Sequence, residues 1–124
     1  MGEACIMSIL IGTPGEVIRV ELLGPELKVA QLVTLIKADA LEVFQLVVPS
    51  GHSVPTHEIQ GEVIVHCLQG RVSLTALGGV HDLGAGQLLY YSTNEPFSVW
   101  GIENALLLIT IARRRLGENV ELIG

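Results

Sequence analysis

The sequence predicts one all-β domain of the sandwich or barrel class. Turn signals built on glycine and proline recur about every 8–12 residues along the chain, a spacing typical of such folds. Short runs rich in Val, Ile, Leu and Tyr lie between these turns, as expected for strands. No long segment combines a helical period with helix start and stop signals. A chain of 124 residues has the size of a single domain.

The strands are placed by the runs between turn signals. The ranges predicted as strands are 16–22, 29–36, 41–48, 62–68, 71–77, 87–91, 97–102 and 105–111. A helix competes with a strand only at 26–44, where the β-branched content favours the strand. The domain itself is expected to span 15–112. It would follow a partly flexible N-terminal extension, 1–14, and precede a C-terminal tail, 113–124.

Both faces of the strand predicted at 62–68 are mostly apolar. Val63 and Val65 lie on one face, and Ile64 and Leu68 lie on the other. A sheet with one face in water would show a polar residue at every second position. A single small barrel covers only its inner face, so the outer face requires a second subunit. Together with a charged fraction of only 16%, this pattern predicts a homodimer.

Net charge and cysteine content indicate which binding partners and which cellular compartment to expect. The formal net charge of −6 argues against nucleic acid, and the basic run at 113–115 is interpreted as a solvated edge. Cys5 and Cys67 are far apart and predict no disulfide. The start of the sequence has no basic leader, and the longest apolar run, 105–112, is shorter than the roughly 20 residues of a membrane helix. We therefore expect a soluble cytoplasmic protein without membrane contact.

The segment 49–70 holds three of the four histidines and one of the two cysteines. Its spacing of Gly51, His57 and Gly70 resembles the first conserved motif of the cupins, and the region from Gly86 resembles the second. The resemblance extends from about Gly15 to Ile111 and is strongest to the small single-domain RmlC-like cupins, whose members mostly have no assigned reaction. It implies a double-stranded β-helix, a jelly-roll barrel that is often dimeric.

The chain departs from the cupin pattern at the metal ligands. In the family, two histidines and a glutamate of the first motif and a histidine of the second hold a divalent transition metal. Here only His57 stands at such a position, while Ile59, Val63 and Phe97 occupy the other three. This combination is typical of a retained scaffold whose metal site has been lost or remodelled. The cofactor therefore stays unknown, with a divalent transition metal as one alternative.

Neighbouring residues could rebuild a site. Glu62 lies one residue before the glutamate position and should point out of the barrel, unless a bulge near Gly61 re-aims it. Cys67 has the parity of an inward residue, and His52 has no readable direction. A set made of His57, Cys67, His52 and Glu62 would suit zinc or copper. His66 has the outward parity of Glu62, and His81 follows a turn and is expected on the solvent side of a hairpin.

Three functions stay open at this point. The first is a protein that holds a small organic ligand in its barrel, with a pocket made of His52, His57, Glu62, Cys67 and Phe97. Phe97 makes that interior more apolar and favours an apolar or aromatic ligand. The second is a metal-dependent oxygenase or isomerase with His57 as an essential ligand. The third is a dimeric β-scaffold that acts through its outer face. No nucleophile motif is present, and no catalytic residue is assigned.

Overall fold

The fold consists of strands and turns in every part of the chain that the computed structural model describes. The described ranges are 5–9, 11–20, 29–55, 61–76, 78–92 and 96–113. No helix in these ranges has the length and apolarity that a membrane crossing requires. The expected all-β class is confirmed.

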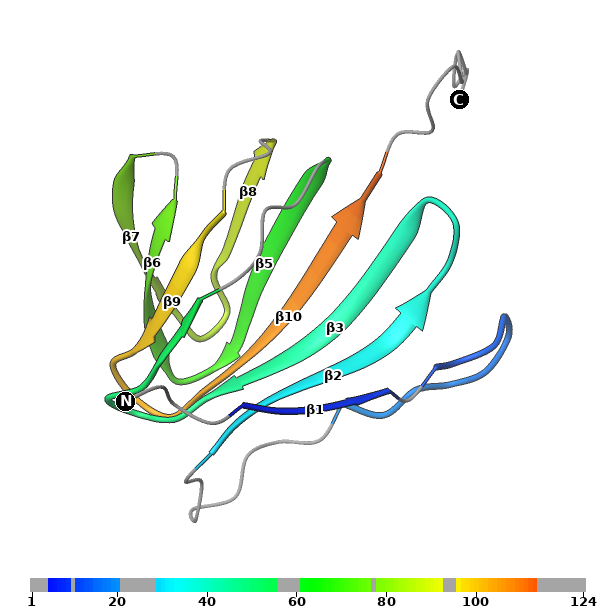
Figure 1. The fold of residues 1–124 in the computed structure, drawn as a ribbon, viewed down its shortest axis with the longest axis horizontal. Coiled ribbons are helices and arrows are strands. Elements are labelled where there is room, and N and C mark those ends of the chain that lie inside the picture. Colours follow the sequence, from blue (N-terminus) through cyan, green and yellow to red (C-terminus); the bar gives the residue numbers. More distant parts are fainter. Residues whose placement is uncertain are drawn as a thin grey trace.

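The strands form two sheets that face each other (Figure 1). In spatial order, the larger sheet contains β1 (Cys5–Ile9), β2 (Ala30–Lys37), β3 (Leu41–Val48), β10 (Ala105–Ala112), β5 (Glu62–Gln69) and β8 (Leu88–Ser92). The smaller sheet contains β4 (Ser53–Pro55), β9 (Ser98–Gly101), β6 (Arg71–Ala76) and β7 (Gly79–Gly84). All pairings are antiparallel except that of β1 with β2. Such a pair of antiparallel sheets is a jelly roll.

The two inner faces meet in one hydrophobic core. In β6, buried Val72 and Leu74 alternate with the outward Arg71 and Ser73, which are at least partly exposed, so this strand has one dry and one wet face. Other strands of both sheets also contribute buried residues to this core. The core includes Leu46, Val48, Val63, Val65, Val99, Leu107, Ile109 and Ile111. Burial of each such side chain stabilises the fold by about 1.5–3 kcal/mol.

The strand predictions were correct for most of the barrel and wrong near the N-terminus. The described part of the predicted strand 16–22 is not a strand, and Glu16 instead closes a turn through its amide and the carbonyl of Thr13, at 3.0 Å. The strands β1, β4 and β7 were not predicted. β4 has only three residues and ends in proline, while β7 has the sequence GVHDLG, which is poor in β-branched residues.

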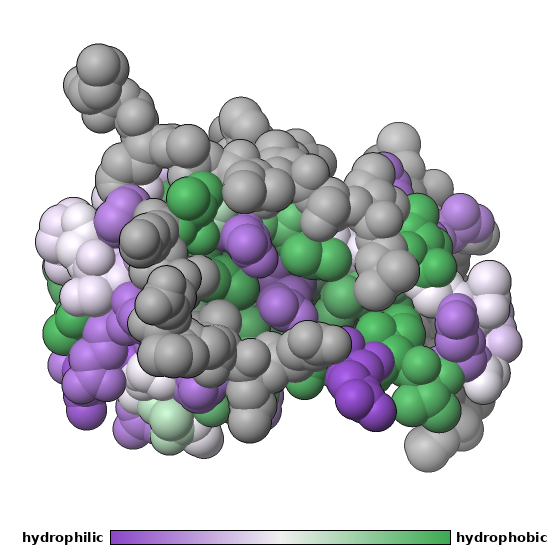
Figure 2. Space-filling model, turned by 90° about the horizontal axis from the view of Figure 1, so that it is seen from below, coloured by the Kyte–Doolittle hydropathy of each residue, from purple (hydrophilic) through white to green (hydrophobic). Residues whose placement is uncertain are grey.

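The outer face of the larger sheet is only partly covered. Val47 and Leu106 are register partners that face outward, yet they are 2% and 0% exposed. Further along the sheet, Ile64, Leu88 and Tyr90 are 39%, 59% and 56% exposed. Figure 2 shows another aspect of the surface on which apolar side chains also lie among hydrophilic ones. The small fraction of charged residues in the sequence is thus explained by a surface that includes exposed apolar side chains.

The turn between β5 and β6 depends on a glycine. Gly70 has a φ of 79°, and a Cβ built there would lie 2.0 Å from the carbonyl oxygen of Asn104. The turn between β7 and β8 has Gly86 at a similar φ of 87°, but open space surrounds the position of its Cβ. The first glycine is therefore required for conformation and for space, and the second for conformation alone.

We expect Gly70→Ala to destabilise the protein much more than Gly86→Ala. The second substitution carries only the cost of a left-handed alanine, about 1–2 kcal/mol, whereas the first adds a backbone clash. Chemical denaturation of both variants measures the difference in the free energy of unfolding. Equal losses for the two variants would show that the turn moves freely away from Asn104.

Candidate functional site

An aromatic pair lines the inside of one end of the barrel. We call this the upper end, where β8 and β10 finish at Ser92 and Ala112 (Figure 1). Tyr91 of β8 is the register partner of Val63 in β5. The ring of Tyr91 contacts that of Phe97 edge to face, with the ring centroids 5.8 Å apart. All three side chains are at most 3% exposed.

The described residues at the upper end supply no metal-donor atoms at the ligand positions of the cupin pattern. Val63 and Phe97 stand at two of the positions where the cupin pattern places a glutamate and a histidine, and both are apolar and buried in the core. His57 and Ile59, at two other positions, lie outside the described residues. Elsewhere in the described ranges, no three residues among His, Cys, Asp and Glu come close enough to hold a metal ion.

Glu62 lies on the outside of the barrel, as its parity predicted. Its carboxylate accepts a hydrogen bond from the hydroxyl of Tyr90, which is exposed on the outer face of β8. Gly61 precedes it with a positive φ but does not turn the side chain inward. His66 shares this outward direction, since it alternates with the buried Val65 and Cys67. The structure therefore does not bring Glu62 into the interior.

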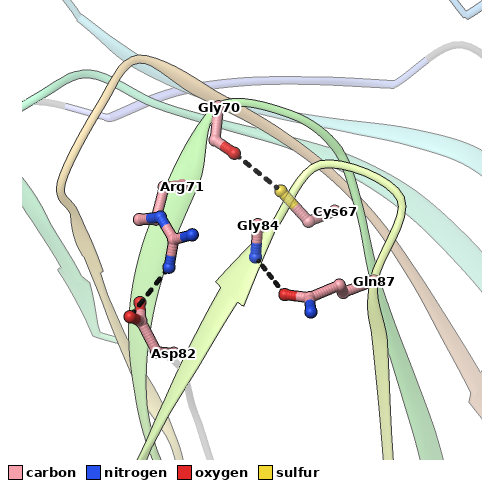
Figure 3. A network of polar contacts seen from close by, with 6 residues as sticks. All are labelled: Cys67, Gly70, Arg71, Asp82, Gly84 and Gln87. Atoms are coloured by element: carbon pink, nitrogen blue, oxygen red, sulfur yellow. Dashed lines mark hydrogen bonds and ion pairs between the residues drawn. The ribbon is translucent and has the colours of Figure 1, made fainter.

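Cys67 faces inward, but it lies at the opposite, lower end. It is four residues along β5 from Val63, a separation of about 13 Å. Its Sγ donates to the carbonyl of Gln69 at 3.3 Å and lies 3.6 Å from that of Gly70 (Figure 3). Burial raises the pKa of the Cys67 thiol above its ordinary value, and the hydrogen bond to Gln69 lowers it by less. The side chain is a neutral, packed thiol at neutral pH.

Hydrogen bonds close the lower end around Cys67. The loop between β7 and β8 is held to β5 because the amide of Gly86 donates to the carbonyl of Cys67 at 2.8 Å and the amide of Cys67 donates to that of Gln87 at 2.9 Å. The side chain of Gln87 in turn accepts from the amide of Gly84 at 2.8 Å. These bonds satisfy the polar groups at this end of the interior.

His52 also belongs to the lower end. It lies in the turn between β3 and β4, where its carbonyl accepts a hydrogen bond from the amide of Gly101 at 2.9 Å. Its Nδ1 is 3.1 Å from the carbonyl oxygen of Ser50. Of the described residues in the predicted pocket, Phe97 is at the upper end, Cys67 and His52 are at the lower end, and Glu62 is outside. The structure does not assemble them into one site.

His81 corrects the expectation of a solvent-side residue. It pairs with the buried Leu74 and shares the inner face of β7 with Leu83, because alternate residues of a strand face the same side. Its Nε2 atom is buried without a hydrogen-bond partner, and so is the hydroxyl of Tyr91. The sequence left open whether Tyr90 or Tyr91 lines a pocket and favoured packing for both, and it placed His81 on the solvent side. Counting alternation back from Leu83 would have placed His81 inside, but β7 itself was not predicted.

Comparison with solved structures finds the same architecture at low sequence identity. A conserved protein of unknown function from Streptococcus pyogenes is 16% identical, with a TM-score of 0.67 over 80% of this chain and 92% of that chain. An RmlC-like cupin family protein with a double-stranded β-helix fold from Methanocaldococcus jannaschii is 19% identical, with a TM-score of 0.63 over 80% and 94%. The cupin domain of an XRE-family transcriptional regulator from Enterobacter cloacae is 13% identical, with a TM-score of 0.62 over 68% and 96%. No protein-family model and no curated protein matches the sequence.

We expect the stability of the protein to fall with rising pH because of Cys67. Its pKa is raised in the folded state above the ordinary value of 9.0, so the folded state retains a proton that the unfolded state loses. The free energy of unfolding should decrease above about pH 9, by up to about 1.4 kcal/mol per pH unit. Denaturation between about pH 7 and pH 10 measures this slope.

The matched variants are Cys67→Ala, which should lose this part of the slope, and Cys5→Ser, which should keep it. A slope that Cys67→Ala leaves unchanged would show that the buried thiol is not the titrating group.

Proposed function

Because this chain has the cupin fold, the double-stranded β-helix, we propose that it binds a small neutral organic molecule inside the upper end of its barrel. One observation carries the proposal. Val63 and Phe97 supply buried apolar surface where the cupin pattern has metal ligands. A site with this lining favours an apolar or aromatic molecule over a metal ion or an anion.

The interior supports a neutral ligand rather than a charged one. None of the described residues that are buried is charged. An ionised ligand would lose its hydration in such an interior without gaining a counter-charge, which costs several kcal/mol. His52, Glu62 and Cys67 lie too far from Phe97, or on the wrong face, to supply a charge. The ligand must therefore be held by apolar contacts and neutral hydrogen bonds.

The donor atoms of the described residues do not favour a metal-dependent oxygenase or isomerase. Hard and borderline cations take oxygen, nitrogen or thiolate ligands, and the side chains of Val63 and Phe97 offer none. Cys67 is a neutral thiol bonded to backbone at the other end of the barrel. The proposal therefore includes no metal-dependent step.

We expect ethylbenzene, as a neutral apolar probe, to bind inside the upper end. A titration followed by ¹H–¹⁵N NMR should give saturable shifts at the amides of Val63, Tyr91 and Phe97, and none at Val80, which is on the outer face of β7. The absence of saturable shifts at the upper end would remove the proposal.

A pair of variants in one strand tests the position of the probe. Val63→Phe fills the inner side of β5 and should weaken ethylbenzene binding at least tenfold. Ile64→Phe adds the same ring to the outer face of the same strand and should leave binding unchanged. Equal effects of the two variants would place the probe elsewhere.

We also propose that the chain forms a homodimer through the outer face of β5 and β8. Ile64 and Tyr90 are register partners there, and the next pair on the same face of the ladder is His66 and Leu88. Ile64, Tyr90 and Leu88 are exposed large apolar side chains, which together form a contiguous patch. A two-fold interface would bury this patch against its own copy.

We expect light scattering coupled to size exclusion to give about twice the chain mass of 13.3 kDa. Leu88→Lys should shift the protein to the monomer mass, because two copies would place the new charges in one apolar interface. Val80→Lys, on the outer face of the smaller sheet, is the matched control and should leave the dimer intact. A wild-type mass of one chain would exclude the dimer.

A further inference from the structure

The geometry points to the hydroxyl of Tyr91 and Nε2 of His81 as the polar atoms that hold the ligand inside the barrel. We propose that they bind the oxygen atoms of a neutral aromatic molecule that carries a carbonyl or hydroxyl group. This inference rests on the proposed function and goes further, because it names the recognising atoms and the chemical class of the ligand.

The first argument is the unmet hydrogen bonding of the two atoms. Within the described ranges, these are the only side-chain nitrogen or oxygen atoms found buried without a partner. A buried polar atom without a hydrogen bond costs about 1–3 kcal/mol, so native proteins satisfy nearly all such atoms with protein, water or ligand. Tyr91 is 3% exposed and His81 is only partly buried, but both polar atoms are buried, and together they indicate a partner that is not part of the chain.

The second argument is their common depth in the barrel. Both side chains lie on inner faces, since His81 pairs with Leu74 and Tyr91 pairs with Val63. The loop between β7 and β8 runs from Gly84 to Gln87 at the lower end. His81 is three residues before Gly84, and Tyr91 is four residues after Gln87. The two residues therefore stand roughly 10–13 Å above that loop on strands that it connects. One molecule at that depth can meet both.

The third argument concerns the chemical class of the ligand. Burial raises the pKa of Tyr91 far above its ordinary value, so its hydroxyl stays neutral and can donate a hydrogen bond. Nε2 of His81 can donate or accept, depending on the tautomer. The ring of Phe97 stands edge to face with that of Tyr91 and adds an aromatic wall. Together they match an aromatic body with one or two oxygen atoms.

Two probes of one shape separate hydrogen bonding from apolar contact. Acetophenone and ethylbenzene differ mainly in the carbonyl oxygen. The affinity of the wild-type protein should be higher for acetophenone. Tyr91→Phe should weaken acetophenone binding about three- to tenfold, the effect of one neutral hydrogen bond, and leave ethylbenzene binding unchanged. Tyr90→Phe removes a hydroxyl from the outer face of the same strand and should change neither affinity.

The histidine is tested in the same way with a hydroxylated probe. His81→Leu should weaken the binding of 4-hydroxyacetophenone about three- to tenfold relative to its effect on ethylbenzene. His66→Leu, on the outer face of β5, is the control and should have no effect. An unchanged ratio of the two affinities in His81→Leu would remove His81 from the site.

A stability measurement on the free protein gives an independent readout. If the hydroxyl of Tyr91 has no partner without ligand, Tyr91→Phe should raise the melting temperature by about 4 °C, because it removes an unsatisfied buried group. Tyr90→Phe should not. A lower melting temperature for Tyr91→Phe would overturn the inference, since it would show a hydroxyl already bonded in the free protein.

The outcomes separate this inference from the proposed function. Failure of the wild-type protein to bind either acetophenone or ethylbenzene overturns both. Binding of both probes with equal loss, or no loss, in Tyr91→Phe overturns only the inference, and leaves an apolar site without polar recognition.

Discussion

The alternation of side chains along β5 is the constraint on which the rest of the site depends. This strand lies between β10 and β8, so its register is held from both sides. Val63, Val65 and Cys67 fill the interior, and the residues between them face outward. A register shift of one residue would exchange the inward and outward sets. The register therefore decides which polar side chains of the strand face the interior. The character of the interior follows from this register alone.

The same constraint explains how the architecture accommodates Val63 and Phe97 at two ligand positions of the cupin pattern. An inner position of a barrel strand requires a side chain of suitable volume. A valine fills it, and its burial stabilises the fold by about 1.5–3 kcal/mol. A carboxylate at the position of Val63 would require a metal ion or another partner to offset its desolvation. An apolar residue at such a position needs no partner and becomes part of the core. Phe97, packed against Tyr91, illustrates the outcome.

Alternation also sets the limit of what the sequence predicts. It correctly placed Glu62 outside and Cys67 inside, because both lie in a long, clearly marked strand. It gave no direction for His52, which lies in a turn whose backbone does not alternate. It failed for His81, because β7 has little β-propensity and was not recognised as a strand. Alternation also gives no position along the barrel axis. Cys67 and Phe97 were therefore assigned to one pocket, although they lie at opposite ends of the barrel.

The two ends of the barrel differ in how completely their described polar groups are satisfied, and the proposed site rests on this difference. At the lower end, Cys67 and the loop ending at Gln87 exchange backbone hydrogen bonds, so that end is closed by the chain itself. Towards the upper end, the described inner-face residues include two polar atoms without partners, on His81 and Tyr91. Folded proteins usually satisfy buried polar atoms with hydrogen bonds. The exceptions tend to lie at functional sites, where a ligand supplies the missing partner. The polar groups of the lower end thus stabilise the fold, whereas the proposed site for a second molecule lies towards the other end.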